Sequence, residues 1–88
     1  MLEIRTHTKF EKDIKRIAKR RKNTEKLWQL VELLLMKKPL PAKHRPHKLT
    51  GNWESFSECH IEPDWLLIYR YTATHLELMR TGSHADLF

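Results

Sequence analysis

The sequence has a single cysteine and lacks any long apolar run. One thiol, Cys59, excludes an internal disulfide framework and a zinc site built from cysteines alone. The longest apolar runs are 33–36 and 65–69, far shorter than the roughly 20 residues that span a bilayer. Arg5 and Lys9 interrupt the start of the chain, so we expect no secretory signal and no membrane partner. These absences predict a small cytoplasmic protein.

Acidic residues are scarce in the first half of the sequence. The whole chain has 17 Lys and Arg against 11 Asp and Glu, a net charge of +6. Residues 1–50 carry 15 of these bases and only 5 of the acids, whereas residues 51–88 carry 2 and 6. A basic half on a small domain predicts attraction to a polyanion such as RNA or DNA. A solvated face that keeps the protein soluble would have the same composition.

The first residues predict a short strand and then a basic helix. Residues 2–6 alternate apolar and polar side chains, as a strand does. Thr8 and Glu11 have the spacing of a capping box that opens a helix over about 8–21. Apolar residues at i, i+4 and i+7 give this helix one stripe for packing, and the rest of its surface is densely cationic. The stripe consists of Phe10, Ile14 and Ile17.

A second helix follows the basic one. Asn23 or Thr24 caps its start, and Pro39 stops it. Its apolar residues cover a wide arc, so we expect it to be covered on more than one side, by the first helix, the sheet or a partner chain. Residues 38–52 then form a proline-rich loop that carries several basic side chains.

The remaining sequence changes to the pattern of strands. Three stretches rich in aromatic and aliphatic residues are separated by short turns, namely 53–61, 64–72 and 75–81. The run 65–69 has no polar alternation, which predicts a central strand covered on both faces. Residues 82–88 run off the sheet. The order β-α-α-β-β-β predicts one α+β domain over 1–88, with a small antiparallel sheet packed against an N-terminal helical hairpin.

Six histidines are many for a chain of this length. His44 and His47 are three residues apart, but the prolines around them exclude a helix that would place both on one face. A zinc site needs three or four nitrogen or sulfur ligands, and the turn expected between His60 and Asp64 does not supply a ligand ladder. The sequence therefore disfavours a bound metal or other cofactor.

The same histidines could instead carry metal-free cleavage of RNA. Attack by the neighbouring 2′-OH needs a base for that hydroxyl, an acid for the leaving 5′-oxygen and a cation for the phosphate. Histidine suits either proton role, Asp64 could orient a histidine or act as base, and Arg80 suits the phosphate. Phe88 could stack on a base. A structural interpretation is also open, in which His60 and Asp64 stabilise a turn, Arg80 lies on a strand surface and Phe88 fills the core.

Three ordered segments carry a family signature, namely 47–51, 58–69 and 80–88. The second contains His-x-x-Pro-Asp-x-Leu-Leu from His60, and the third contains Gly-x-His-x-x-Leu-Phe from Gly82. With the basic N-terminal helices, these segments resemble the YafQ branch of the RelE/ParE toxin superfamily over nearly the whole chain. The resemblance implies a microbial-RNase-like (RelE-like) fold. It also implies a type II toxin that cuts mRNA in the ribosomal A site.

The resemblance implies roles for individual side chains. His84 is the expected general acid for the 5′-oxygen, and the 2′-OH base is either Asp64 or His60 with Asp64 as its partner. His47 and Arg80 would hold the scissile phosphate. The residues that match the family's functional positions are His47, His60, Asp64, His84 and Phe88. Arg80, Lys48 and Glu58 are expected to bind the phosphate or another part of the substrate.

The resemblance also implies partners. The basic helices would dock on ribosomal RNA of the 70S ribosome, mRNA would be the substrate, and a cognate antitoxin would cover the helices or the pocket. The residues expected to contact ribosomal RNA are Lys9, Lys12, Lys15, Arg16, Lys19, Arg20 and Lys22. Two other functions stay open at this point. They are a non-catalytic growth inhibitor that acts on DNA gyrase, as ParE-type relatives do, and a plain RNA-binding module.

Overall fold

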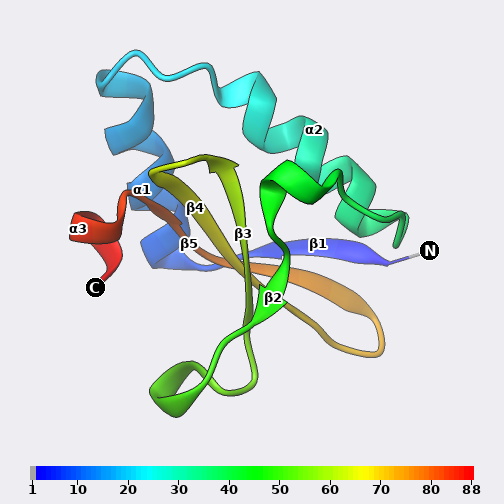
Figure 1. Ribbon diagram of the computed structural model, residues 1–88. Helices are drawn as coiled ribbons and strands as arrows, with labels where there is room; N and C mark the ends of the chain where they lie inside the picture. Colours follow the sequence, from blue (N-terminus) through cyan, green and yellow to red (C-terminus); the bar gives the residue numbers. More distant parts are fainter. Residues whose placement is uncertain (1) are drawn as a thin grey trace.

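Five strands form one sheet in the order β1-β5-β4-β3-β2, and two helices cover one of its faces (Figure 1). The computed structural model describes residues 2–88. The strands are β1 Glu3–Thr6, β2 His47–Lys48, β3 Ser57–Glu62, β4 Trp65–Tyr71 and β5 His75–Gly82. The helices are α1 Thr8–Lys19, α2 Thr24–Leu35 and α3 His84–Leu87, with short 3-10 turns η1 Ala42–His44 and η2 Gly51–Trp53. The predicted α+β class, with a helical pair on one face, is confirmed.

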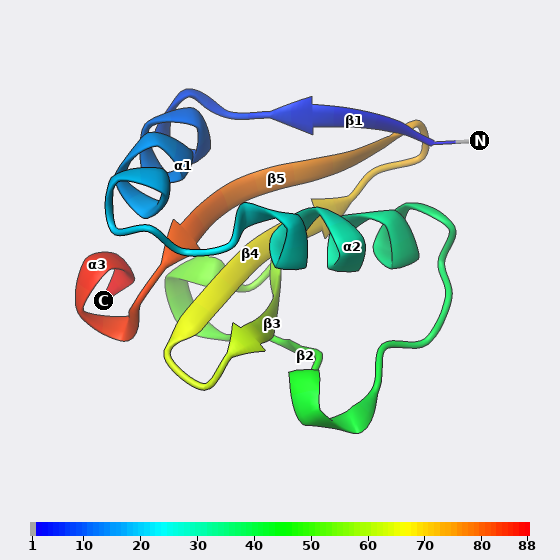
Figure 2. The same ribbon diagram turned by 90° about the horizontal axis from the view of Figure 1, so that it is seen from above.

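The sheet is antiparallel except at one edge, where β1 lies parallel to β5 (Figure 2). Ile4 pairs with Leu76 in this ladder, and Thr6 pairs with Leu78. The prediction of an antiparallel sheet is therefore wrong for this pair of strands. The connection between them runs through the helical hairpin and three strands, and a long connection of this kind permits parallel pairing. No local pattern in the sequence specifies which distant strand β1 meets.

The core has two parts, one on each face of the sheet. The larger part lies between the helices and the sheet and includes Phe10, Ile17, Leu27, Leu30, Val31, Leu34, Cys59, Trp65, Leu67 and Leu78. On the other face, Leu66 and Ile68 of β4 pack with Leu87 of α3. All five residues of 65–69 are buried, so the prediction that β4 is covered on both faces is confirmed. In the described part of the chain, no helix has the length and apolar character needed to cross a bilayer.

The start of α1 differs from the predicted capping box. The residue before the helix is His7, whose side chain makes no cap hydrogen bond. The Glu11 carboxylate instead accepts a hydrogen bond of 2.8 Å from the hydroxyl of Thr6. The box of Thr8 and Glu11 is therefore wrong, and the helix ends at Lys19, two residues earlier than predicted.

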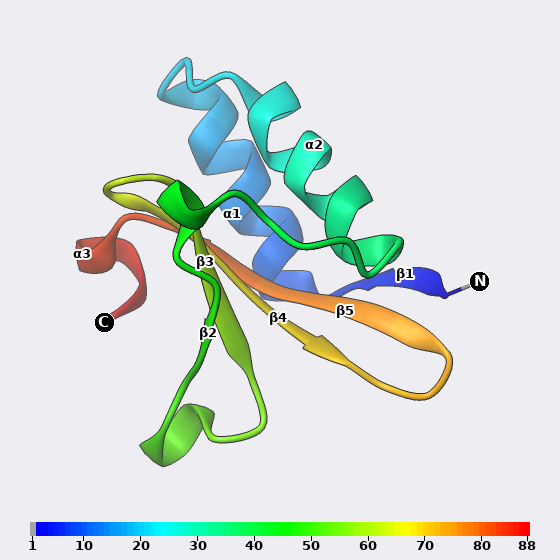
Figure 3. The same cartoon turned by 45° about the vertical axis from the view of Figure 1, so that its right-hand side comes forward.

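Short elements lie where the sequence pattern predicted irregular chain. Asn23 does cap α2, since its side chain accepts the backbone N–H of Glu25 at 3.1 Å. The loop over 38–52, however, includes β2, and β2 and η2 extend away from the helices (Figure 3). The strand expected from residue 53 begins only at Ser57, because η2 occupies Gly51–Trp53. Residues 82–88 turn into α3 after leaving the sheet.

Candidate active site

The strand register places a row of side chains on the sheet face opposite the helices. His47 of β2 pairs with Glu58 of β3, Glu58 pairs with Ile68 of β4, and Ile68 pairs with Arg80 of β5. Directly opposed residues of neighbouring strands point to the same face. His60 lies two residues beyond Glu58 on β3 and therefore shares that face. Side chains that are far apart in the sequence thus meet on one open surface.

Three imidazoles lie side by side on this surface. The ring centroids of His47 and His60 are 6.1 Å apart, and those of His60 and His84 are 6.0 Å apart. His84 reaches the row from α3, which directly follows β5. The fold therefore brings together all three histidines that the sequence analysis assigned to the site. Within residues 2–88, no group of three or more histidine, cysteine or acidic side chains has the arrangement to hold a metal ion.

Asp64 is bonded to His84 and not to His60. Its Oδ1 lies 2.7 Å from Nδ1 of His84 and also accepts the backbone N–H of His84 at 2.9 Å. These two hydrogen bonds, the backbone one above all, hold the pKa of Asp64 below its usual value. The predicted pairing of His60 with Asp64 is wrong, because the turn between β3 and β4 places this carboxylate beside the start of α3.

His60 has no carboxylate bonded to its ring within the described residues. Its Nδ1 is buried and has no hydrogen-bond partner in residues 2–88. Burial lowers the pKa of His60, and the charges of His47, Arg45 and His84 add to this effect, while Glu58 opposes it. A histidine with a lowered pKa is neutral near pH 7 and can accept a proton.

Both ring nitrogens of His47 lie close to an oxygen atom that can accept a hydrogen bond. Nδ1 is 2.7 Å from the carbonyl oxygen of Arg45, and Nε2 is 3.0 Å from Oε2 of Glu58. Contacts at both ring nitrogens fix the orientation of the His47 ring. Lys48 is not beside the imidazoles, since it pairs with Ser57 and lies on the opposite face of the sheet. The expectation that Lys48 contacts the substrate therefore has no support from the register.

Arg80 is bound to a buried carboxylate on α1. Its Nε lies 2.7 Å from Oδ2 of Asp13, and its Nη2 lies 3.1 Å from Oδ1. Asp13 also accepts the backbone N–H of Thr81 at 3.1 Å, on the edge of β5 beyond the last residue paired with β1. The Asp13 carboxylate thus accepts the backbone hydrogen bond that a neighbouring strand would accept at this position of the sheet edge. It also fixes the position of the permanently charged guanidinium of Arg80.

Asp13 was not among the site residues predicted from the sequence, although a signal was present. Asp13 is 2% exposed and lies three residues after Phe10 and four before Ile17, on the buried stripe of α1. A charged residue on such a stripe needs a buried partner. The partners, Arg80 and Thr81, are on a distant strand, so the sequence alone could indicate the need for a partner but not its identity.

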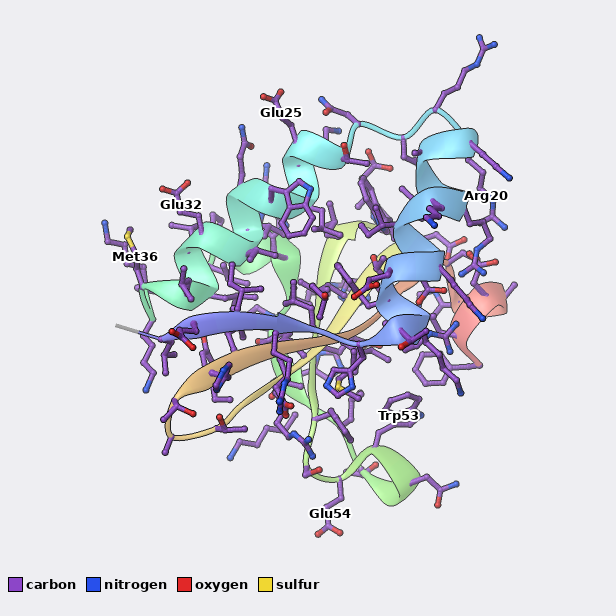
Figure 4. All side chains as sticks on the ribbon, turned by 180° about the vertical axis from the view of Figure 1, so that it is seen from behind. Arg20, Glu25, Glu32, Met36, Trp53 and Glu54 are labelled. Carbon is purple, nitrogen blue, oxygen red and sulfur yellow. The ribbon has the colours of Figure 1, made fainter. Side chains whose placement is uncertain are left out.

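Phe88 lies at the rim of the site and not in the core. It is 62% exposed, and its ring packs edge-on against Trp53 of η2, with centroids 6.4 Å apart. Leu87 fills the core position beside it, so the interpretation of Phe88 as a core residue is wrong. Figure 4 shows Trp53 on the turn below the sheet, and the sequence analysis also missed this residue. The exposed aromatic ring is available for stacking on a base.

The seven cations expected to contact ribosomal RNA divide into two groups. Three of them form ion pairs within the chain, namely Arg16 with Asp13, Arg20 with Asp86 and Lys22 with Glu62. The other four are exposed on α1 and make no ion pair with residues 2–88, namely Lys9, Lys12, Lys15 and Lys19. The cationic surface free to bind a polyanion is therefore narrower than composition suggests.

Comparison with known proteins extends over the whole described fold. A family model described as a bacterial toxin of type II toxin–antitoxin system, YafQ, matches residues 2–88. The mRNA interferase toxin YafQ of Escherichia coli K12 is 42% identical over 87 residues, which are 98% of this chain and 95% of that protein. In a crystal structure of the E. coli DinJ–YafQ complex, the matching chain has a TM-score of 0.92 and 42% identity, covering 100% of this chain and 99% of that one. A metal-bound toxin from Helicobacter pylori has a TM-score of 0.94 and 40% identity over 100% of both chains.

Proposed function

Because the chain belongs to the YafQ family of bacterial toxins from type II toxin–antitoxin systems, we propose that it is an mRNA endoribonuclease that acts on the ribosome. The observation that carries the proposal is the row of three imidazoles on the open sheet face, with Asp64 bonded to one end. The E. coli relative is named an mRNA interferase, which supports RNA as the substrate. The reaction needs only proton transfer and charge stabilisation, which these side chains supply.

His84 acts as the general acid in this proposal. Asp64 binds its Nδ1, so Nε2 is the nitrogen that faces the leaving 5′-oxygen. The carboxylate also stabilises the imidazolium that must hold the proton before it is donated. The lowered pKa of Asp64 makes its carboxylate a weak base, so Asp64 serves to orient His84 rather than to abstract a proton.

His60 acts as the general base. Its lowered pKa keeps the ring neutral at pH 7, and it lies beside His84 with 6.0 Å between ring centroids. The two imidazoles can thus serve the attacking and leaving oxygens of one phosphate. The 2′-oxygen bonds to phosphorus as the bond to the 5′-oxygen breaks. The products are a 2′,3′-cyclic phosphate and a free 5′-hydroxyl, and the proton that His60 takes balances the one that His84 donates.

His47 and Arg80 stabilise the charge that builds up on the phosphate. Both lie on the same sheet face as His60, and Arg80 keeps its charge at any physiological pH. Glu58 holds His47 from Nε2, and Asp13 holds Arg80 through its Nε. Charged and hydrogen-bonding groups that are held in place beside the reacting phosphate lower the barrier because they need no reorganisation during the reaction.

The proposed partners are the 70S ribosome with its mRNA, and a cognate antitoxin. The four lysines of α1 that make no ion pair with residues 2–88 would contact ribosomal RNA, and such a target is consistent with a cytoplasmic protein. A relative that is 42% identical forms a complex with DinJ, which supports an antitoxin as the second partner. The Phe88 ring would stack on a base of the mRNA and help to place the scissile bond.

Toeprinting on a defined mRNA tests the proposal. Reactions contain wild-type protein, His84→Ala or the control His75→Ala, each with and without 70S ribosomes. His75 is bonded to Thr74 at the far end of β5, so its replacement removes a histidine without touching the site. We expect A-site cuts only with ribosomes and only from the wild type and the control. Cuts in free mRNA would contradict ribosome dependence, and growth arrest with intact mRNA would favour a gyrase inhibitor.

A further inference from the structure

The helix that carries His84 is too short to be stable by itself. α3 has four residues, and isolated helices below about 12 residues are marginal in water. Its position must therefore come from contacts with the rest of the fold. Two of these contacts are described above, namely Leu87 in the smaller core and Asp64 on the backbone of His84. A third contact comes from α1, which lies beside α3 (Figure 2).

Asp86 is at the centre of this third contact. Its carboxylate accepts the backbone N–H of Ser83 at 2.9 Å, and its own N–H donates to the Ser83 hydroxyl at 3.1 Å, which completes a capping box. The carboxylate also lies directly over Gly82, whose φ is +155°. A Cβ at position 82 would be 2.9 Å from Cβ of Asp86, so only glycine lets the side chain approach this closely.

Arg20 binds the same carboxylate from the end of α1. Its two terminal nitrogens lie 2.6 and 3.0 Å from the two oxygens of Asp86, a bidentate fork (Figure 4 labels Arg20). Hydrogen bonding to Arg20 is the main cause that holds the pKa of Asp86 far below its usual value. Bidentate pairs between arginine and a carboxylate fix orientation as well as distance. The fork therefore ties the start of α3 to a helix that is 66 residues away in the sequence.

The fork is one end of a longer ion-pair network. Arg16 lies between two carboxylates, with Nη2 2.6 Å from Oδ1 of Asp13 and Nε 3.9 Å from Oδ2 of Asp86. Asp13 in turn binds Arg80. Positive and negative side chains therefore alternate along this network, which leads from β5 across α1 to α3 and back to the end of α1. The order is Arg80, Asp13, Arg16, Asp86 and Arg20. One face of α1 thus links the proposed phosphate-binding arginine with the helix of the proposed acid.

We infer that Arg20 and Asp86 are positioning residues that hold α3, and with it His84, in place against the sheet. The inference rests on the proposed function, in which His84 is the acid. It also reassigns Arg20, which the family resemblance had placed among the expected contacts to ribosomal RNA. Neither residue touches the substrate in this role. The network makes α1 a support for the active site on one face and a cationic surface on the other.

The two roles of Arg20 predict different responses to substitution. A contact to an RNA phosphate needs a positive charge, which lysine also provides, whereas the fork on Asp86 needs the planar guanidinium. Asp86 is negative and cannot bind phosphate, so Asp86→Asn removes the fork without removing an RNA contact. Neutralising this acid would, if anything, strengthen attraction to a polyanion. Arg20→Lys and Asp86→Asn therefore separate positioning from RNA binding.

The first measurement is single-turnover cleavage at saturating 70S ribosomes, together with ribosome affinity. Arg20→Lys and Asp86→Asn should each lower the rate constant by about 10- to 100-fold while ribosome affinity does not fall. The double variant should be no slower than the slower single variant, since both changes break one contact. The matched control is Arg21→Asn. Arg21 forms no ion pair with residues 2–88, and asparagine tolerates its φ of +60°, so the control should cleave like the wild type.

The second measurement is made on the free protein and needs no activity. Nuclear magnetic resonance relaxation should show that backbone order parameters of residues 84–88 fall from about 0.85 to below about 0.6 in both variants, while the sheet amides keep their values. A full cleavage rate for Arg20→Lys, or an α3 as ordered in Asp86→Asn as in the wild type, would overturn the inference. If the wild type cuts no mRNA, the proposed function fails, and the relaxation data still decide whether this pair holds α3.

Discussion

Oδ1 of Asp64 is hydrogen-bonded to His84 twice, at 2.7 Å to the ring Nδ1 and at 2.9 Å to the backbone N–H. The backbone contact fixes the first residue of α3, and the ring contact fixes the rotation of the imidazole. A residue whose backbone and ring are both held has already lost the conformational freedom that would otherwise have to be restricted in the transition state. The pair is thus a preorganised unit, although both side chains are largely exposed.

Asp64→Asn should slow cleavage without unfolding the protein. Asparagine keeps an acceptor for the backbone N–H of His84 but loses the charge that stabilises the imidazolium. We expect the single-turnover rate constant to fall by about 10²-fold or more. Because Asp64 is 69% exposed, the melting temperature should stay close to that of the wild type. A rate near the wild-type value would show that His84 does not depend on this carboxylate.

The pH profile should report the base. His60 must be neutral to accept a proton, and burial lowers its pKa from the usual 6.5. Activity should therefore persist as the pH falls through 6.5 and decline only below that value. Glu58 raises the pKa of His60, so Glu58→Gln should move the acid limb of kcat/KM to still lower pH. An acid limb with its midpoint above 6.5 would contradict His60 as the base.

Deletion of Phe88 should separate activity from stability. The ring is 62% exposed and contacts Trp53 only edge-on, so its loss should change the melting temperature little. Cleavage should fall, because the mRNA base loses its stacking partner, which is worth about 1–3 kcal/mol. Leu87→Ala is the matched comparison, since Leu87 is buried and its truncation should lower the melting temperature. A deletion variant with full activity would exclude the stacking role.

Asp13→Ala should destabilise the fold. The substitution leaves the Arg80 guanidinium and the Thr81 N–H without their acceptor in a buried setting. Breaking such a pair costs about 3 kcal/mol. Urea unfolding would measure the loss, with Glu32→Ala on the exposed side of α2 as a control that changes stability by about 0.5 kcal/mol or less. Equal midpoints for the two variants would refute the buried network.

Local sequence patterns predicted most of the helices and longer strands, whereas contacts between distant residues determine how these elements pair and pack. The cap at Asn23 and the unbroken apolar run of β4 depend on neighbouring residues, and both predictions are confirmed. The parallel pairing of β1 with β5 depends on which strands meet after collapse, and no local pattern specifies it. The capping box of Ser83 and Asp86 is a local signal for the start of α3, but a helix of four residues also needs Asp64 and Arg20 from elsewhere in the fold, so local propensity was not enough to predict it.

The same limit applies to the candidate site. Its histidines were identified by resemblance to a family, and the strand register explains why His47 and His60 share a face. The partner of Asp64 was predicted wrongly, because the choice between His60 and His84 depends on the turn that carries this carboxylate. Lys48 follows a predicted site residue in the sequence, yet alternation along β2 places it on the other face.

The parallel contact between β1 and β5 also affects how the protein is made. Translation delivers β1 and α1 first, but the strand that pairs with one and packs against the other comes after β2, β3 and β4. Contacts between such distant parts of the chain raise the contact order, and here they cannot form before β5 has been synthesised. A nascent chain that lacks β5 and α3 has neither Arg80 nor His84 in place. In the proposed mechanism, which needs both side chains, the order of the elements therefore keeps a nascent chain from cleaving RNA until translation of the domain is almost complete.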